Sequence, residues 1–162
     1  MNKLPANLPE NWLIEQTQLI LNSYRKWTGK ELAVLAHGHD QKSKLAQATE
    51  LFYAPFVVVT SNNAADPLLN YGNKQALDLW EMPWEVLTQT PGRCTAEPMH
   101  RDQRQKFLNT VQKNGFIDNY AGIRISHTGK RFKIEKATVW NLLDERGTYL
   151  GQAATFSHWK CL

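Results

Sequence analysis

The chain has 162 residues, of which 42% are hydrophobic and 21% are charged, so it has enough apolar sequence for one ordinary domain and is neither disordered nor fibrous. Its 19 basic and 15 acidic residues give a net charge of +4 at pH 7. Because acids interrupt the basic clusters, we expect solvated faces and no nucleic-acid partner. No apolar run approaches the roughly 18 residues of a membrane span, no secretory signal opens the sequence, and the two cysteines make no disulfide framework. These features predict a cytoplasmic protein that binds no membrane.

Two helices are expected in the first third of the chain. Residues 9–27 carry a stripe of apolar side chains at helical spacing, formed by Leu13, Ile20, Tyr24 and Trp27. A second helical pattern covers residues 41–53. The sequence ELAVLAHGHD at residues 31–40 has no clear helical or strand pattern, and the role of residues 29–42 stays open.

Strands and helices follow one another in the middle of the chain. The segment Phe56 to Thr60 is β-branched and aromatic, which predicts a buried strand. Asn73 is a good cap for the helix that follows it, and Gly115 is expected to end the longest helix. The elements predicted here are strands at residues 56–60 and 68–71, and helices at residues 74–80, from Pro83 and at 99–114.

The last third of the chain is expected to be all β. Strands are predicted at residues 120–126, 132–142 and 149–159, with hairpin turns at 127–130 and 144–147. The alternation in the first of these strands places Ile123 inward and Arg124 outward, and Lys133 and Glu135 are also expected to face solvent. The alternation slips near Glu135 and Lys136, which indicates a β-bulge.

This order of elements is that of a PAS domain. It predicts an α+β fold with a five-stranded antiparallel sheet and helices on one face, preceded by N-terminal helices. The last strand, which contains the motif GQAATF, is expected at the centre of the sheet. Ligands of PAS domains bind between the helices and the sheet.

Three segments of the sequence resemble the MEKHLA domain, a PAS-related family. They are NYGNKQALDLWEMPWEVL, GRCTAEP, and YAGIRISHTGKRFKIEKATVWNLLDERGTYLGQAATFSHW. The resemblance covers residues 43–159 and is to the small stand-alone bacterial type, although the family also occurs at the C-terminus of plant class III homeodomain–leucine zipper factors. It implies sensing or protein interaction and names no ligand. We therefore divide the chain into an N-terminal helical extension, residues 1–42, and a MEKHLA/PAS-like domain, residues 43–162.

A cavity between helices and sheet is the place where a ligand is expected. Aromatic walls with one amide suit a small planar molecule, although the same side chains can simply fill a core. Small residues in the last strand, Ala154 among them, either allow close packing or leave space for a ligand. The candidate pocket residues are Tyr71, Trp80, Cys94, Phe107, Trp140, Gln152, Ala154 and Phe156.

The sequence names no cofactor and no metal. Cys94 lies where light-oxygen-voltage PAS domains carry a flavin-reactive cysteine, but the residues around it depart from their motif, so we expect no photochemistry. A redox-sensitive thiol and an inert cysteine are the interpretations that remain. The five histidines are expected at the surface, since none is well placed to ligate haem and none has metal-ligand spacing.

Two hypotheses for function follow. The first is a PAS-like sensory or ligand-binding signalling module that acts through an unknown partner chain, and the second is a pure protein-interaction module with a filled core and no ligand. The sequence contains no nucleophile elbow, zinc-protease helix, phosphate loop or dinucleotide fingerprint, so we expect no enzyme and no catalytic residue. Because the stripe formed by Leu13, Ile20, Tyr24 and Trp27 belongs to a helix outside the PAS-like core, we expect a homodimer formed through it. The alternative is that the stripe packs on its own domain.

Overall fold

Six strands form one antiparallel sheet in this computed structural model, which describes residues 2–33 and 35–162. The strands are β1 (Val57–Ser61), β2 (Leu69–Gly72), β3 (Phe116–Ile125), β4 (Arg131–Leu143), β5 (Tyr149–Phe156) and β6 (His158–Cys161). Their order is β2-β1-β5-β4-β3, and β6 pairs with the first part of β4. Strand β5, which contains GQAATF, therefore lies between β1 and β4 at the centre of the sheet, as predicted.

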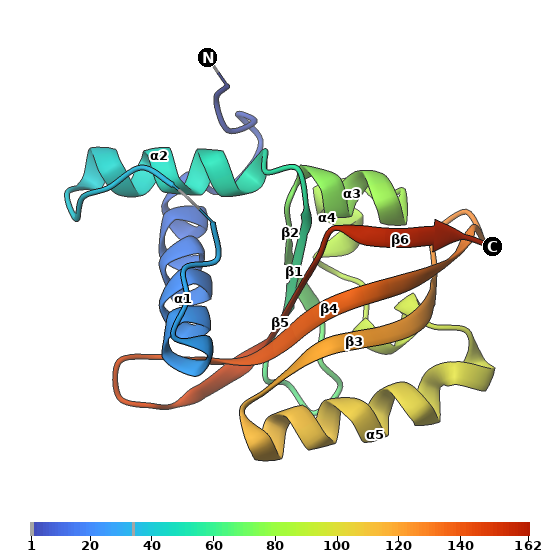
Figure 1. The fold of residues 1–162 in the computed structure, drawn as a ribbon. Helices are drawn as coiled ribbons and strands as arrows, with labels where there is room; N and C mark the ends of the chain where they lie inside the picture. The colour runs from blue at the N-terminus through green and yellow to red at the C-terminus, as the bar shows by residue number, and fades with distance from the viewer. Residues whose placement is uncertain (1, 34) are drawn as a thin grey trace.

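Helices cover both faces of this sheet (Figure 1). They are α1 (Glu10–Thr28), α2 (Gln41–Phe52), α3 (Lys74–Trp80), α4 (Trp84–Leu87), the 3₁₀ turn η1 (Gly92–Thr95) and α5 (Pro98–Asn114). Helices α3 and α5 lie on one face and α4 packs beside the edge strand β2, which is the expected PAS-like layer. The two N-terminal helices α1 and α2 lie on the opposite face, so the sheet is enclosed between two helical layers.

Asn73 explains why the chain changes from strand to helix after β2. Its side chain is fully buried. The Oδ1 atom accepts hydrogen bonds from the backbone N–H groups of Val58 and Ala76 at 3.1 and 3.2 Å. The Nδ2 group donates to the carbonyls of Leu51 and Phe56 at 3.2 and 2.8 Å. One amide thus caps α3, as predicted, and also fixes the end of α2 and the start of β1 against it.

Strand β4 contains the predicted bulge. Tyr120 of β3 pairs with Ala137, and Gly122 pairs with Ile134, so two residues of β4 lie opposite one residue of β3. The extra residue is accommodated by Lys136, whose φ is 54°. As a result, Ile134 and Ala137 face the same side of the sheet although three positions separate them.

The last predicted strand is interrupted once. Strand β5 ends at Phe156 and β6 begins at His158, with Ser157 between them. Thr155 pairs with Thr138 and His158 pairs with Glu135, so both parts keep one register along β4. The break changes the direction of the strand without a slip in its pairing.

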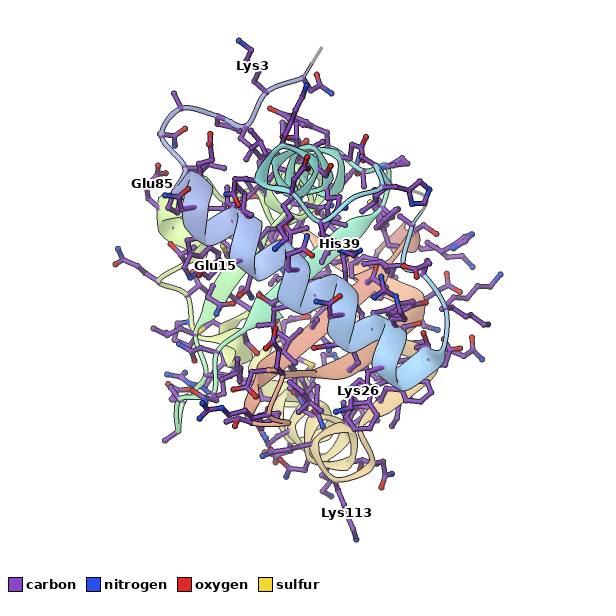
Figure 2. All side chains as sticks on the ribbon, turned by 90° about the vertical axis from the view of Figure 1, so that its left-hand side faces the viewer. Lys3, Glu15, Lys26, His39, Glu85 and Lys113 are labelled. Atoms are coloured by element: carbon purple, nitrogen blue, oxygen red, sulfur yellow. The ribbon has the colours of Figure 1, made fainter. Side chains whose placement is uncertain are left out.

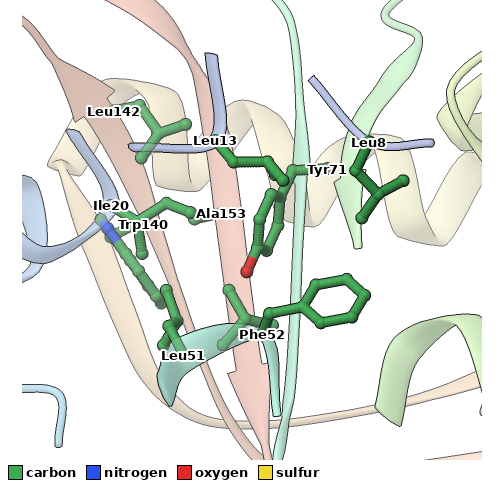
Figure 3. Close-up of a cluster of buried hydrophobic side chains, with 10 residues drawn as sticks. Leu8, Leu13, Ile20, Leu51, Phe52, Tyr71, Trp140, Leu142 and Ala153 are labelled. Atoms are coloured by element: carbon green, nitrogen blue, oxygen red, sulfur yellow. The ribbon is translucent and has the colours of Figure 1, made fainter. Parts of the chain in front are cut away.

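Helix α1 belongs to the core of the domain. Leu13 is 1% exposed and Ile20 is 0% exposed. They lie in one apolar cluster with Trp140, Leu142 and Ala153 of the sheet, as Figure 3 shows. Figure 2 shows α1 lying across this face of the sheet, beneath α2. The core thus includes side chains from both the N-terminal helices and the strands.

Polar contacts also bind α1 to the sheet. The indole N–H of Trp27 donates to the Asn141 carbonyl at 2.9 Å. The Ser23 hydroxyl donates to the Leu143 carbonyl at 3.2 Å and accepts from its N–H at 3.0 Å. The expectation that the α1 stripe is exposed outside the core is therefore corrected. This face of the sheet is apolar and needs a cover, and the chain supplies that cover itself.

The described residues of the segment 31–40 form a loop held by α2; Val34 lies outside the described residues. The Ala36 N–H donates to Glu50 Oε2 at 2.8 Å. The Gln47 side-chain amide donates to the carbonyls of Ala36 and Gly38 at 2.8 and 3.2 Å. Within residues 2–33 and 35–162, no helix is both long and apolar enough to cross a membrane.

Candidate functional site

A cavity of about 80 Å³ lies between α5, η1 and the sheet. Most of its walls are apolar, and two arginines from α5 and β3 are the charged groups that reach it. The lining residues are Val59, Leu69, Trp80, Thr95, Arg104, Phe107, Leu108, Tyr120, Arg124, Ile134, Ala137, Val139, Ala154 and Phe156.

Strand alternation builds the floor of this cavity. Ala154 of β5 pairs with Val59 on one side and with Val139 on the other, so these three side chains form a row across the sheet. The bulge in β4 keeps Ile134 and Ala137 on the same face as this row. Because alanine is the smallest of the three central side chains, space remains above the middle of the sheet.

Arg124 is held in place at the β3 side of the cavity. Arg124 is buried, with 8% of its surface exposed. The Nη2 group donates to the Tyr120 hydroxyl at 3.1 Å, and Nη1 donates to the Ile123 carbonyl at 2.9 Å. The Tyr120 ring in turn stacks on Phe107 of α5, with ring centroids 3.7 Å apart. An aromatic pair therefore supports the buried guanidinium.

Arg104 of α5 is the second charged group of the cavity. Among the residues that the structure describes, it has neither a hydrogen-bond acceptor nor a carboxylate in ion-pair contact. Burial, and then the nearby charge of Arg124, lower the pKa of Arg104 to about 10. The guanidinium is still protonated at neutral pH, so the cavity holds two positive charges without a matching anion.

A second hollow of about 200 Å³ adjoins the cavity. The two share Arg104, Phe107, Tyr120 and Arg124, so the arginines lie where the cavity meets the protein surface. A molecule that enters from this side meets the two positive charges first and the apolar walls after them.

Four of the predicted pocket residues line the cavity. Trp80 of α3 and Phe107 of α5 form walls, and Ala154 and Phe156 belong to the floor. Ala154 borders the cavity, and whether its small size serves packing or a ligand stays a prediction to test.

Tyr71 and Trp140 lie on the opposite face of the sheet. Both belong to the cluster beneath α1 (Figure 3), and the Trp140 ring packs edge-on against Tyr24 at 5.0 Å. The reason is strand parity, because Trp140 follows Val139 and Ala153 precedes Ala154, and successive side chains point to opposite faces. These two aromatic residues fill the second core and do not reach the cavity.

Cys94 and Gln152 lie near the cavity without lining it. Cys94 is half-buried in η1, and the Arg93 guanidinium at 3.8 Å from its Sγ also pairs with Asp66 at 3.2 Å. The neighbouring Thr95, and not Cys94, faces the cavity. The Gln152 amide donates to the Leu108 carbonyl of α5 at 3.0 Å, so it ties the helix to the sheet.

Sequence reasoning missed both arginines. The expectation that Arg124 faces solvent is wrong, because β3 runs with Arg124 and Ser126 buried and Ala121 exposed. Gly122, on the cavity side of β3, was the available signal: a glycine between two inward positions of a strand indicates that something large approaches there. Arg104 gave no such signal, since an arginine on a polar helix is ordinarily solvated.

One of the five histidines, His100, lines the hollow beside the cavity. His100 is half-buried in α5 and its Nε2 atom has no hydrogen-bond partner, while His37, His39, His127 and His158 are exposed. Over the described ranges 2–33 and 35–162, no group of three His, Cys, Asp or Glu side chains is placed to hold a metal ion.

The comparison with protein families finds one match that covers most of the chain. The MEKHLA domain matches residues 14–161, a range that includes most of α1. Two curated rice proteins, both named homeobox-leucine zipper protein HOX29, from Oryza sativa subsp. indica and subsp. japonica, are 25% identical to this chain over 132 residues, or 79% of it. The chain spans only 15% and 14% of the length of these relatives.

Solved structures with similar folds are PAS and light-oxygen-voltage proteins. The PAS domain of a protein from Colwellia psychrerythraea has a TM-score of 0.58 at 14% identity, over 72% of this chain and 93% of that one. An RNA-binding light-oxygen-voltage receptor has a TM-score of 0.56 at 13% identity, over 64% of this chain and 30% of that one. A light-oxygen-voltage domain studied with a flavin analogue has a TM-score of 0.53 at 15% identity, over 71% of this chain and 83% of that one. At these identities the comparison supports the PAS-like fold alone.

Proposed function

Since this chain belongs to the MEKHLA domain family, we propose that it is a sensory module that binds a small molecule and signals through a partner chain. The observation that carries the proposal is the cavity of about 80 Å³ between α5 and the sheet. Its walls combine apolar side chains with a few polar groups, which is the usual composition of a ligand site. The cavity has no arrangement of nucleophile, base and orienting group, so the proposed function is binding and not catalysis.

Asn141 connects α5, which covers the cavity, with α1 on the opposite face of the sheet. Asn141 of β4 donates from its side chain to the carbonyls of Val111 and Gln112, at 3.2 and 3.0 Å, near the end of α5. The backbone carbonyl of the same residue accepts from the Trp27 indole of α1 at 2.9 Å. A ligand that displaces α5 would therefore act on a residue that also contacts α1 through the sheet.

Self-association is a separate question from ligand binding. Burial of Leu13 and Ile20 in their own domain removes the argument that an exposed stripe needs a second copy. The partner of the proposed module then meets the outer surface of α1 and α2, or binds after α1 has moved. Light scattering on the purified chain measures whether that partner is a second copy.

Native mass spectrometry of the purified protein tests the proposed function. We expect a retained small molecule on the wild-type chain and none on the matched variant Ala154→Leu, whose larger side chain occupies the cavity. Hydrogen exchange on both variants then measures whether the amides of α1 respond to the bound molecule, as the Asn141 contact predicts.

The opposite result favours the second hypothesis. A bare chain mass for both variants, together with melting curves that no member of a small-molecule library shifts, would indicate an interaction module without a ligand. In that case Ala154→Leu should change only stability.

A further inference from the structure

Buried Arg124 and half-buried Arg104 face one apolar cavity, and among the described residues no carboxylate pairs with either. Arg104 comes from α5 and Arg124 from β3, and both line the cavity and the hollow beside it. Arg124 donates only to neutral groups, the Tyr120 hydroxyl and a backbone carbonyl. Among the described residues, no carboxylate shifts the pKa of Arg104; burial and the charge of Arg124 lower it, and Tyr120 and Cys94 raise it by less. Folding gains little from such a pair, because like charges repel strongly where water is scarce.

Two glycines make room for these guanidinium groups. A Cβ atom on Gly92 would lie 2.8 Å from Nη2 of Arg104, and one on Gly122 would lie 2.9 Å from Nη1 of Arg124. Neither glycine has a positive φ, so backbone conformation does not require glycine at either position. A side chain at either position would require the guanidinium group to shift, and at Gly122 also the nearer Tyr120 hydroxyl.

The rest of the cavity is apolar. Phe107 and Leu108 of α5 face the aliphatic floor formed around Ala154. The volume of about 80 Å³ is smaller than the cavity of roughly 150 Å³ that holds a benzene molecule. It therefore suits a body of a few carbon atoms, with a charged end at the arginines and the adjoining hollow.

We infer that the ligand of this cavity is a small organic carboxylate, whose charged end lies between Arg104 and Arg124 and whose short apolar body lies against Phe107, Leu108 and Ala154. This inference rests on the proposed function and names the chemical class of its ligand. A guanidinium presents paired N–H donors that match the two oxygens of a carboxylate. One bound negative charge removes the repulsion between the two arginines, and the apolar walls select acids with a hydrocarbon body over inorganic anions.

Calorimetric titration with named probes tests this inference. The probes are propionate and isovalerate, their neutral amides propionamide and isovaleramide, and inorganic phosphate. We expect at least one acid to bind with one-to-one stoichiometry and to raise the melting temperature in a saturable way. Each amide should bind at least ten-fold more weakly than its acid, and phosphate more weakly than both acids.

Substitutions assign the binding to the two arginines. Arg104→Met should weaken acid binding at least ten-fold, and Arg124→Met should do the same where the variant folds. Lys106→Met is the matched control, because it removes a positive charge from the exposed side of the same helix and should leave binding unchanged. Arg104→Met suffices for the test if Arg124→Met unfolds, since within the described residues the Arg104 side chain makes no ion pair and methionine keeps its apolar stem.

Several results would overturn the inference. They are the absence of binding by both acids, equal binding of acid and amide, binding of phosphate as tight as that of the acids, and equal losses in Arg104→Met and Lys106→Met. A neutral molecule retained in native mass spectrometry, without any response to the acids, would refute the carboxylate and leave the sensory module standing.

Discussion

Replacing Arg104 by methionine should stabilise the unliganded protein. Methionine keeps an unbranched apolar chain in place of the arginine stem, so packing against α5 and the sheet is largely retained. The substitution removes a half-buried charge that has no hydrogen-bond or ion-pair partner among the described residues and that lies near a second positive charge. Removing an uncompensated buried charge is one of the few point substitutions expected to raise stability.

The size of the effect follows from the pKa of this group. The folded protein lowers the pKa of Arg104 to about 10, and each pKa unit below the ordinary arginine value corresponds to about 1.4 kcal/mol. The upper limit is therefore about 3 kcal/mol, and because the residue is only partly enclosed we expect about 1 to 2 kcal/mol in practice. For a chain of this length that corresponds to a rise in melting temperature of roughly 3 to 6 °C.

The stability difference between Arg104→Met and the wild type should depend on pH in one direction. Because the folded-state pKa is lowered, charged Arg104 destabilises the folded protein at all pH values below about 10, and the penalty fades as pH rises beyond that value. Urea unfolding at pH 7 should thus show the full difference between the variant and the wild type, and the difference should shrink above pH 10. Lys106→Met, on the exposed side of α5, should change stability by less than about 0.5 kcal/mol. A fall in stability for Arg104→Met at pH 7 would refute the reasoning, because it would mean that the guanidinium has a stabilising partner.

Four further predictions concern the cavity, the cap and the outer core. Ala154→Leu should keep or raise the melting temperature, because its three added carbons enter the cavity, and it should abolish ligand binding; a loss of about 1 to 3 kcal/mol would instead indicate overpacking. Asn73→Ala should cost about 3 kcal/mol or more in urea unfolding, since four buried hydrogen bonds depend on that amide; a loss under about 1 kcal/mol would show that water replaces them. The purified protein should have no flavin or haem absorption band, because the cavity of about 80 Å³ is far below the roughly 300 Å³ or more of a cofactor site; a band that bleaches and disappears in Cys94→Ala would revive the photochemical hypothesis. Deletion of residues 1–40 should uncover Trp140 and its neighbours and give an aggregated or unfolded chain by light scattering; a stable monomer would show that the 43–162 segment folds without α1.

The element order could be predicted because its signals are local. The helix at residues 74–80 begins after a capping asparagine, and Gly115 ends α5 where expected. The bulge at Lys136 was visible as a change in alternation, since a single added residue reverses which side chains are apolar. Each of these signals depends on a few neighbouring residues, so the sequence displays them directly.

The site could be predicted only in part because it depends on which face each strand presents. Trp80 and Phe107 were identified, but Trp140 was assigned to the cavity although it packs beneath α1. Both faces of β4 are buried here, so hydrophobicity does not distinguish the cavity face from the α1 face. The burial of Arg124 depends on the register of β3 opposite the bulge, which is a contact between strands and leaves little trace in either strand alone.

The enclosed sheet also constrains how a signal can leave this module. A free antiparallel sheet face could bind a partner directly, but here Leu13 and Ile20 of α1 occupy that face. The outer side of α1 is polar, with Glu15 and Lys26 exposed (Figure 2). On this side of the sheet, a partner of the proposed module would either recognise this polar helical surface or compete with α1 for the apolar sheet. The second route requires breaking the Trp27 hydrogen bond to Asn141, and Asn141 is the residue that also holds the end of the cavity helix α5. Trp27→Phe, which removes the donor and keeps an aromatic ring, loosens α1 and separates the two routes: it should strengthen partner binding if release of α1 is the signalling step, and leave partner binding unchanged if the polar surface is the contact.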